Sequence, residues 1–295
     1  MIPVLWGITL VVFLLVQFTP GDPARMVLGE EATREELEAL RRRMGLDLPV
    51  HEQYFNWIGG VLVGNWGDSL IDRRAVFPTL MGLMPATLEL VMVSMVVTLG
   101  IGIPVGIITA VKRDTIIDNL GRAGALVGIC MPNFWLGIML MLFFALQYPI
   151  LPPSGRGTFA HLVLPSLTLG IPGAAIVTRM CRSSILDILG QDFIRTARAK
   201  GLNERVVIYQ HALRNALIPV ITIVGLQLGF RLGGTVIVES VFAWPGIGRF
   251  AYQRMLMRDL PMIMGNLLLF AGMFCIVNLL VDLMYGVVDP RIRYD

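Results

Sequence analysis

Residues Arg195–Pro219 read RTARAKGLNERVVIYQHALRNALIP, a polar and basic stretch between two long apolar runs. Gly201 divides the stretch into two short helical pieces. Basic loops between membrane spans lie on the cytoplasmic side. The stretch therefore predicts a structured cytoplasmic surface that docks on another protein. Its charged residues are Arg195, Arg198, Lys200, Arg205 and Arg214, against the single acid Glu204.

The composition of the chain is that of an all-α integral membrane protein. Of its 295 residues 55% are hydrophobic and 15% charged, and the mean hydropathy is +0.71. Soluble domains carry roughly a quarter charged residues. The net charge is only +3, and the basic residues concentrate in loops between apolar runs, so we predict no nucleic-acid partner. The three cysteines are isolated, which predicts apolar packing rather than disulfides or zinc.

Six apolar runs are long enough to approach or cross a bilayer, which takes roughly 20 residues. Met1 leads directly into the first run without a basic region or a small-residue cleavage site, which favours a membrane span over a cleaved signal peptide. The six predicted spans are residues 2–18, 86–110, 124–147, 162–180, 217–237 and 264–286.

Lysine and arginine counts in the short loops give the orientation of these spans. The loop between spans two and three, the loop between spans four and five, and the C-terminal tail are all basic. We predict that these segments and both termini are cytoplasmic. The long segment 19–84 then forms an extracytoplasmic module.

Two helices are expected inside this module. Thr33 and Glu36 have the spacing of a capping box, which opens a helix that continues through Met44 and ends at Gly45. A second helix covers about 50–63. The module is either a cap packed on the ends of the spans or a docking surface for a protein that delivers substrate. In a later outer segment, Trp244 is expected in a tight turn as an interfacial anchor.

No enzyme motif is present in the sequence. The chain lacks a GxxxxGK[ST] phosphate-binding loop, an HExxH motif and a GxSxG motif, and its three histidines are far apart. We therefore predict that the chain is not an enzyme and binds neither cofactor nor metal itself.

The fifth span has two patterned faces. Gly225, Gly229 and Gly233 recur every fourth residue, a stripe that favours close helix packing. Gln227 and Arg231 lie on roughly the opposite face. A charge at membrane depth is costly and usually faces a bundle interior or an aqueous cavity. We predict that Gln227 and Arg231 line a translocation path; alternatively, Arg231 extends outward or pairs with a neighbouring subunit.

Asp282 is a charge within the sixth predicted span. We predict a structural ion pair of Asp282 with Arg179 or Arg182, and the competing interpretation is a proton relay. Kinks are expected at Pro132–Asn133 in the third span and at Pro172–Gly173 in the fourth.

The basic stretch resembles the cytoplasmic EAA loop of type I ABC importer permeases. Its residues are typical of the dipeptide/oligopeptide/nickel branch of that family. Gly201, Ala197 and Leu213 match the family's glycine, second alanine and leucine. Three residues depart from its consensus, which has Glu, Ile and Pro where this chain has Arg195, His211 and Arg214. The resemblance assigns ATPase coupling to eight residues: Arg195, Ala197, Gly201, Leu202, Glu204, His211, Leu213 and Arg214.

Further stretches extend the resemblance over nearly the whole chain and indicate the first permease of such systems. They are PGDPAR at 20–25, MGLDLPVHEQY at 44–54, HLVLPSLTLG at 161–170, GGTVIVESVFAWPGIGR at 233–249 and NLLVDLMYGVVDPRIRY at 278–294.

The resemblance implies a domain plan and a set of partners. The plan is a first transmembrane helix at 1–18, the module 19–84, a permease domain 85–286 with its coupling loop at about 183–216, and a cytoplasmic tail 287–295. The implied partners are a second permease, two ATPases that hold ATP and magnesium, and an extracytoplasmic binding protein. The implied location is the bacterial inner membrane.

These expectations favour an importer of di- and oligopeptides, including glutathione-like peptides. The nearest alternative is the same machine carrying nickel or a metal chelate, because MPNFW (131–135) and FAWPGIGR (242–249) resemble nickel members too. A proton-coupled secondary transporter that uses Asp282, and a receptor or scaffold without flux, are rival classes. Neither explains the basic, glycine-divided loop as well.

Overall fold

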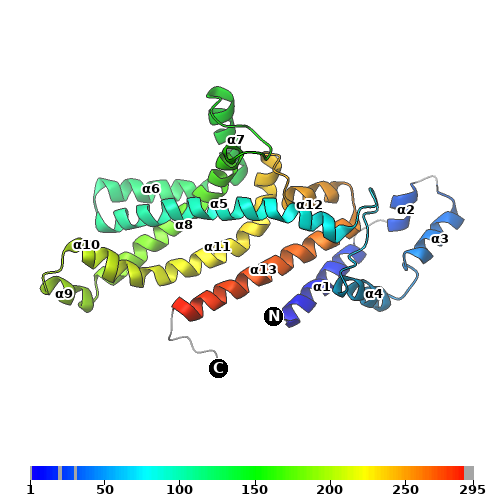
Figure 1. The fold of residues 1–295 in the computed structure, drawn as a ribbon, viewed down its shortest axis with the longest axis horizontal. Coiled ribbons are helices and arrows are strands. Elements are labelled where there is room, and N and C mark those ends of the chain that lie inside the picture. The colour runs from blue at the N-terminus through cyan, green and yellow to red at the C-terminus, as the bar shows by residue number, and fades with distance from the viewer. Residues whose placement is uncertain (1, 19–21, 30–31, 289–295) are drawn as a thin grey trace. The chain divides into compact units, whose positions relative to one another are not determined.

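The structure is a computed structural model that describes residues 2–18, 22–29 and 32–288 (Figure 1). The chain divides into two compact units. The first unit joins Met1–Pro85 to Gly246–Cys275, and the second joins Ala86–Pro245 to Ile276–Asp295. The first unit therefore combines the predicted module 19–84 with a segment more than 150 residues later in the chain.

The first unit is built from short helices and the N-terminal parts of two long ones. Its helices are α1 (Ile2–Gln17), α2 (Pro23–Leu28), α3 (Arg34–Arg43), α4 (Val50–Leu62) and α12 (Ile247–Leu256), together with the beginnings of α5 (Val76–Val111) and α13 (Leu260–Val288).

The two helices predicted in the module are confirmed. Thr33 and Glu36 form both hydrogen bonds of the capping box at the start of α3, and Gly45 follows the helix with φ +67°. α4 packs against α1, where the Tyr54 hydroxyl lies 2.8 Å from Oγ1 of Thr9. Tyr54, Val12, Phe13 and Met264 form one buried apolar cluster, so this part of the module packs on the apolar helices of the first unit.

A buried ionic network ties the 69–72 turn to α12. Arg254 donates from Nη2 to Asp72 at 2.6 Å and from Nη1 to Asp259 at 3.0 Å. The hydroxyl of Ser69 donates to the same Asp259 oxygen at 2.6 Å. The hydrogen bond from Arg254 lowers the pKa of Asp72 to about 2, so this carboxylate stays charged in neutral and mildly acidic solution.

The second unit is a bundle of long helices in which α8 is central (Figure 1). In chain order after α5 come α6 (Ile116–Cys130), α7 (Asn133–Met141), a π-helical turn η1 (Leu142–Gln147), α8 (Phe159–Leu189), α9 (Asp192–Ala199), α10 (Glu204–Val206), a second π-helical turn η2 (Val207–Ala212) and α11 (Leu213–Val241).

Glycines allow α5 and α8 to pack so closely that the backbone of one helix contacts side chains of the other. A Cβ added at Gly102 would come 2.8 Å from Val177, and one at Gly106 would come 2.7 Å from the Cβ of Cys181. On α8, a Cβ added at Gly170 would come 2.5 Å from Val97. Hydroxyl groups cross the same contact, since Thr98 donates to the Gly170 carbonyl at 3.0 Å. Small residues and hydroxyl hydrogen bonds are the means by which helices associate in lipid.

Fewer helices pass a length-and-hydropathy test for a span than the six predicted. Among the described residues four long helices qualify: Val76–Val111, Phe159–Leu189, Glu204–Arg231 and Leu260–Val281. The pair Ile116–Cys130 and Asn133–Gln147 makes a fifth if it is counted as one span, and the apolar helix Pro3–Leu15 is shorter than the rest.

The predicted kink at Pro132–Asn133 is confirmed and is a sharp one. The two helices of the pair are bent by 103° at this break. Met131, which precedes the proline, is extended with ψ 123°, because the proline ring disfavours a helical conformation in the residue before it. At Pro172–Gly173, where a kink is also expected, α8 continues as one helix that contains both Pro165 and Pro172, and the kink there stays a prediction.

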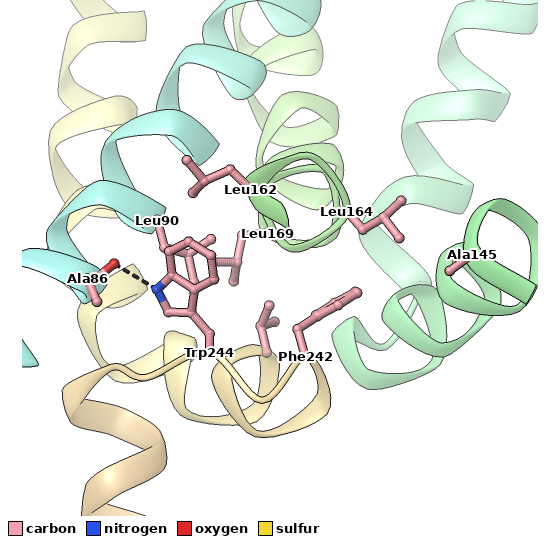
Figure 2. Close-up of a cluster of buried hydrophobic side chains, with 9 residues drawn as sticks. Ala86, Leu90, Ala145, Leu162, Leu164, Leu169, Phe242 and Trp244 are labelled. Carbon is pink, nitrogen blue, oxygen red and sulfur yellow. Dashed lines mark hydrogen bonds between the residues drawn. The ribbon is translucent and has the colours of Figure 1, made fainter. Parts of the chain in front are cut away.

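Trp244 occupies the centre of a buried cluster, so its assignment as an interfacial anchor is wrong. Its side chain is fully buried, and its indole Nε1 donates to the carbonyl of Ala86 at 2.8 Å (Figure 2). Leu90, Leu169 and Phe242 belong to the same cluster. A buried indole needs a partner for its N–H, and the turn after α11 brings the ring to a backbone carbonyl that provides one.

We predict that Trp244→Ala lowers stability by about 4 kcal/mol, because it leaves a large cavity in the buried cluster. The thermal unfolding midpoint of the purified protein in detergent should fall by roughly 8 °C or more. Trp135→Ala is the control, because Trp135 is 44% exposed. Equal shifts for the two variants would contradict the central role of Trp244.

Candidate functional site

The 183–216 loop folds around the predicted glycine break. α9 ends at Ala199, and Gly201 follows in the left-handed conformation with φ +76°. The amides of Gly201 and Leu202 donate to the carbonyls of Arg198 and Ala197, at 3.0 and 3.4 Å. These two bonds are a Schellman motif, whose left-handed position glycine takes at the lowest cost.

The loop also has a small apolar core of its own. Ile194 and Ala197 on α9 pack against Val207 and Ala212 of η2, and all four are buried. Arg198 joins the two pieces on the outside by two hydrogen bonds to Glu204, at 2.6 and 3.2 Å. The loop is therefore a compact folded element and not a solvated linker.

The eight residues predicted to couple to an ATPase divide into internal and surface positions. Ala197 is buried, while His211 and Leu213 are half-buried. The remaining five are exposed: Arg195, Gly201, Leu202, Glu204 and Arg214.

Two further side chains of the loop escaped the sequence prediction. Phe193 and Tyr209 are 42% and 57% exposed, and with Leu202 they place apolar groups on the outside of an otherwise basic element. Exposed aromatic residues in a structured loop are typical of protein contacts. The spacing of Phe193 and Tyr209 relative to the buried residues of α9 and η2 is visible in the sequence, and it could have indicated that both side chains face outward.

Arg182 forms an ion pair with Asp118. Its Nε and Nη2 donate to the two oxygens of Asp118 at 2.7 and 2.8 Å, and Asp118 is fully buried. This bidentate pair joins the start of α6 to α8. The side chain of Asp282 lies outside the described residues, so its pairing with Arg179 or Arg182 stays a prediction.

Arg231 and Gln227 lie together against α5 and α8. Arg231 is buried, and its guanidinium donates to Ser94 at 2.8 Å, to Thr98 at 2.5 Å and to Oε1 of Gln227 at 3.4 Å. Ser94 and Thr98 are four residues apart, so they share one face of an apolar helix, but this spacing does not identify their partner.

The three glycines of the α11 stripe have different surroundings. An added Cβ at Gly225 would come 2.5 Å from Cγ1 of Val281 on α13, so the two backbones approach closely there. Gly229 is buried. At Gly233 an added Cβ would meet no heavy atom of the described chain within 4 Å.

No group of three or more His, Cys, Asp or Glu side chains that could hold a metal ion is found among the described residues.

Family comparisons give these features a common context. Residues 102–294 match the family described as the inner membrane component of binding-protein-dependent transport systems, and residues 1–91 match the N-terminal part of such components. The chain belongs to this family, the membrane-embedded permeases of ABC importers.

Curated relatives are similar over the full length of the chain. The glutathione transport system permease protein GsiC of Salmonella typhimurium strain LT2 is 44% identical over 294 residues, which cover 100% of this chain and 96% of that protein. The protein of the same name from Escherichia coli strain K12 is 43% identical with the same coverage.

Solved structures support the fold at lower sequence similarity. A chain of the inward-facing MetNI methionine ABC transporter aligns with a TM-score of 0.61 at 20% identity, covering 72% of this chain and 96% of that one. A chain of an amino acid ABC transporter crystallised with histidines aligns with a TM-score of 0.54 at 18% identity, covering 70% and 93%. The type I importer fold predicted from the sequence is therefore confirmed.

We predict that Asp118→Asn destabilises the protein by about 2–3 kcal/mol, because it leaves the guanidinium of Arg182 without its buried counter-charge. Thermal unfolding in detergent should show the loss. Asp192→Asn serves as control, since this exposed aspartate also pairs with an arginine and should change little. A shift as small as that of the control would mean that the Asp118–Arg182 pair does not stabilise the bundle.

Proposed function

We propose that the chain is one of two permease subunits of an ATP-driven importer for glutathione or similar short peptides. The observation that carries the proposal is full-length similarity, at 43–44% identity, to permeases named for glutathione transport. Such coverage includes the first unit as well as the helical bundle. The chains of the solved methionine and amino acid transporters cover 70–72% of this chain.

The proposed partners are a homologous second permease, two ATPases that bind ATP and magnesium, and a binding protein outside the membrane. The 183–216 loop would dock on an ATPase. Its own apolar core and its Schellman turn support this role, because a rigid element can pass on a displacement that a flexible linker would absorb. Leu202, Phe193 and Tyr209 would supply the apolar contacts, and Arg195 and Arg214 the charged ones.

The proposed orientation places the 183–216 loop and both termini in the cytoplasm and the 19–84 module outside. The basic residues of the loops support this orientation. Substrate would pass along a path that includes Gln227 and Arg231 of α11. Glycine contacts such as Gly225 with Val281 would let neighbouring helices stay closely packed as the path alternates between the two sides.

The first test is to purify the tagged chain in mild detergent and to identify the proteins that accompany it. We expect a second permease and ATPases, and we expect the reconstituted complex with its binding protein to import glutathione only when ATP is present. Import of nickel chelates without any peptide would favour the alternative cargo. Flux through the chain alone, without ATPases, would contradict the importer proposal and point to a secondary transporter.

A second test distinguishes the effect of side-chain size at Gly201 from the effect of backbone strain there. An added Cβ at Gly201 meets nothing within 4 Å, so a larger side chain there would project outward from the loop. Gly201→Ala and Gly201→Trp carry the same cost of a left-handed non-glycine residue, roughly 1 kcal/mol. Only the tryptophan adds a large group on the proposed docking face.

We expect Gly201→Trp to reduce uptake about tenfold or more while the ATPases keep hydrolysing ATP, and Gly201→Ala to retain most of the uptake. The measurements are ATP hydrolysis and glutathione uptake by the same proteoliposomes. Equal losses in both variants would assign the effect to backbone strain. Normal uptake by Gly201→Trp at wild-type expression would contradict the docking role.

A further inference from the structure

Arg231 is a buried cation whose described neighbours are all neutral. It is 8% exposed, and its hydrogen-bond acceptors are the hydroxyls of Ser94 and Thr98 and the amide oxygen of Gln227. Within the described ranges no carboxylate oxygen lies within 4.0 Å of its nitrogens. The charge of Arg231 is therefore solvated by dipoles but not neutralised.

This arrangement contrasts with Arg254, the other arginine that is buried in the described part of the chain. Arg254 is equally buried at 8% exposure, yet it is held between the two carboxylates of Asp72 and Asp259. A buried charge is normally paired because desolvation without a counter-charge is costly. Arginine within a membrane span commonly marks a substrate or ion pathway.

Gln227 adds a second donor beside the guanidinium. Arginine can only donate hydrogen bonds, so the amide oxygen of Gln227 must face Arg231 and its Nε2 must point away. This Nε2 is buried and has no hydrogen-bond partner in the described chain. A guanidinium and an unused amide N–H, one helical turn apart on α11, together match the acceptor oxygens of a carboxylate.

α8 presents bare backbone to the same cluster at Gly173. An added Cβ there would overlap Nη2 of Arg231 and would come 2.7 Å from Oε1 of Gln227 and 2.9 Å from Oγ1 of Thr98. Only glycine fits while the guanidinium keeps this position. Pro172 precedes it, and these two residues are the least favourable ones for a helix interior, so α8 is weakest where it covers Arg231.

We propose that Arg231 and Gln227 form an anion site that binds a carboxylate of the substrate during translocation. The inference rests on the proposed function and names the chemical group that the path recognises. In the described conformation Ser94, Thr98 and Gln227 hold the guanidinium, and the substrate carboxylate replaces part of these neutral acceptors when α8 moves away from α11. The exchange matters for selectivity, because a charged acceptor bonds more strongly than a hydroxyl.

The binding test uses the purified transporter without its binding protein. Ligand that binds the folded state raises the unfolding midpoint by mass action. We expect 10 mM glutathione, but not glutathione diamide, in which both carboxylates are neutral, to raise the midpoint of the wild type by a few degrees. The rise should be lost in Arg231→Gln and largely kept in Arg231→Lys. No rise in the wild type, or an equal rise in Arg231→Gln or with the diamide, would overturn the proposal.

Uptake separates this proposal from the proposed function. With loaded binding protein at saturation, we expect Arg231→Gln to lower glutathione uptake about tenfold, the effect of one lost charge-assisted hydrogen bond. Arg113→Gln removes an equal charge from an exposed loop and should import normally. Normal import by Arg231→Gln would refute the anion site alone, whereas no ATP-dependent import by the wild type would refute the proposed function.

Gly173→Ala keeps the charge but displaces the guanidinium, so it provides a second variant if Arg231→Gln fails to assemble. We expect it to lower the glutathione-induced rise of the midpoint while the complex still co-purifies with its partners. An unchanged rise in Gly173→Ala would mean that the position of the guanidinium does not matter, which contradicts a built site.

Discussion

The close approach of α8 to α5 is the contact on which the bundle depends. Lipid offers no hydrogen bonds and no hydrophobic gain for helices that come together, so association relies on small residues and on polar groups that meet across the interface. Gly102 and Gly106 on α5 and Gly170 on α8 provide that approach, and Thr98 bonds the Gly170 carbonyl across it. At the same depth Thr98 also accepts from Arg231, so the packing contact and the buried cation share one hydroxyl.

The same bundle holds its charges in two different ways. The Asp118–Arg182 pair joins α6 to α8 near the 183–216 loop and is neutral overall, which suits a permanent connection. Arg231 has only neutral acceptors among the described residues, which suits a group that must release one partner and take another. Between these sites α8 is the common element, so a displacement of the loop that reaches α8 also reaches Gly173 and the guanidinium packed on it.

Much of the fold could be predicted from local patterns. The helix break at Pro132 and the capping box at Thr33 depend on a few neighbouring residues, and the structure confirms both. The two-part shape of the basic loop follows from one glycine and is also confirmed. Trp244 was placed wrongly because tryptophan is common at membrane interfaces, whereas here a turn carries it into the bundle, where the Ala86 carbonyl takes its N–H.

The sequence by itself determined that the protein is a helical membrane protein with a basic, glycine-divided loop, because apolar length, helical period and charge are properties of short segments. Only the tertiary structure decided which polar groups meet. Arg182 lies 64 residues from Asp118, and Arg231 lies 137 residues from Ser94 and 133 from Thr98. Such partners are selected by the packing of whole helices, which no local pattern in one chain encodes. The sequence placed Arg231 in a membrane span and left open whether it faces the bundle or extends outward. The fold decided that Arg231 is buried and that its described neighbours are hydroxyls, an amide and a bare glycine.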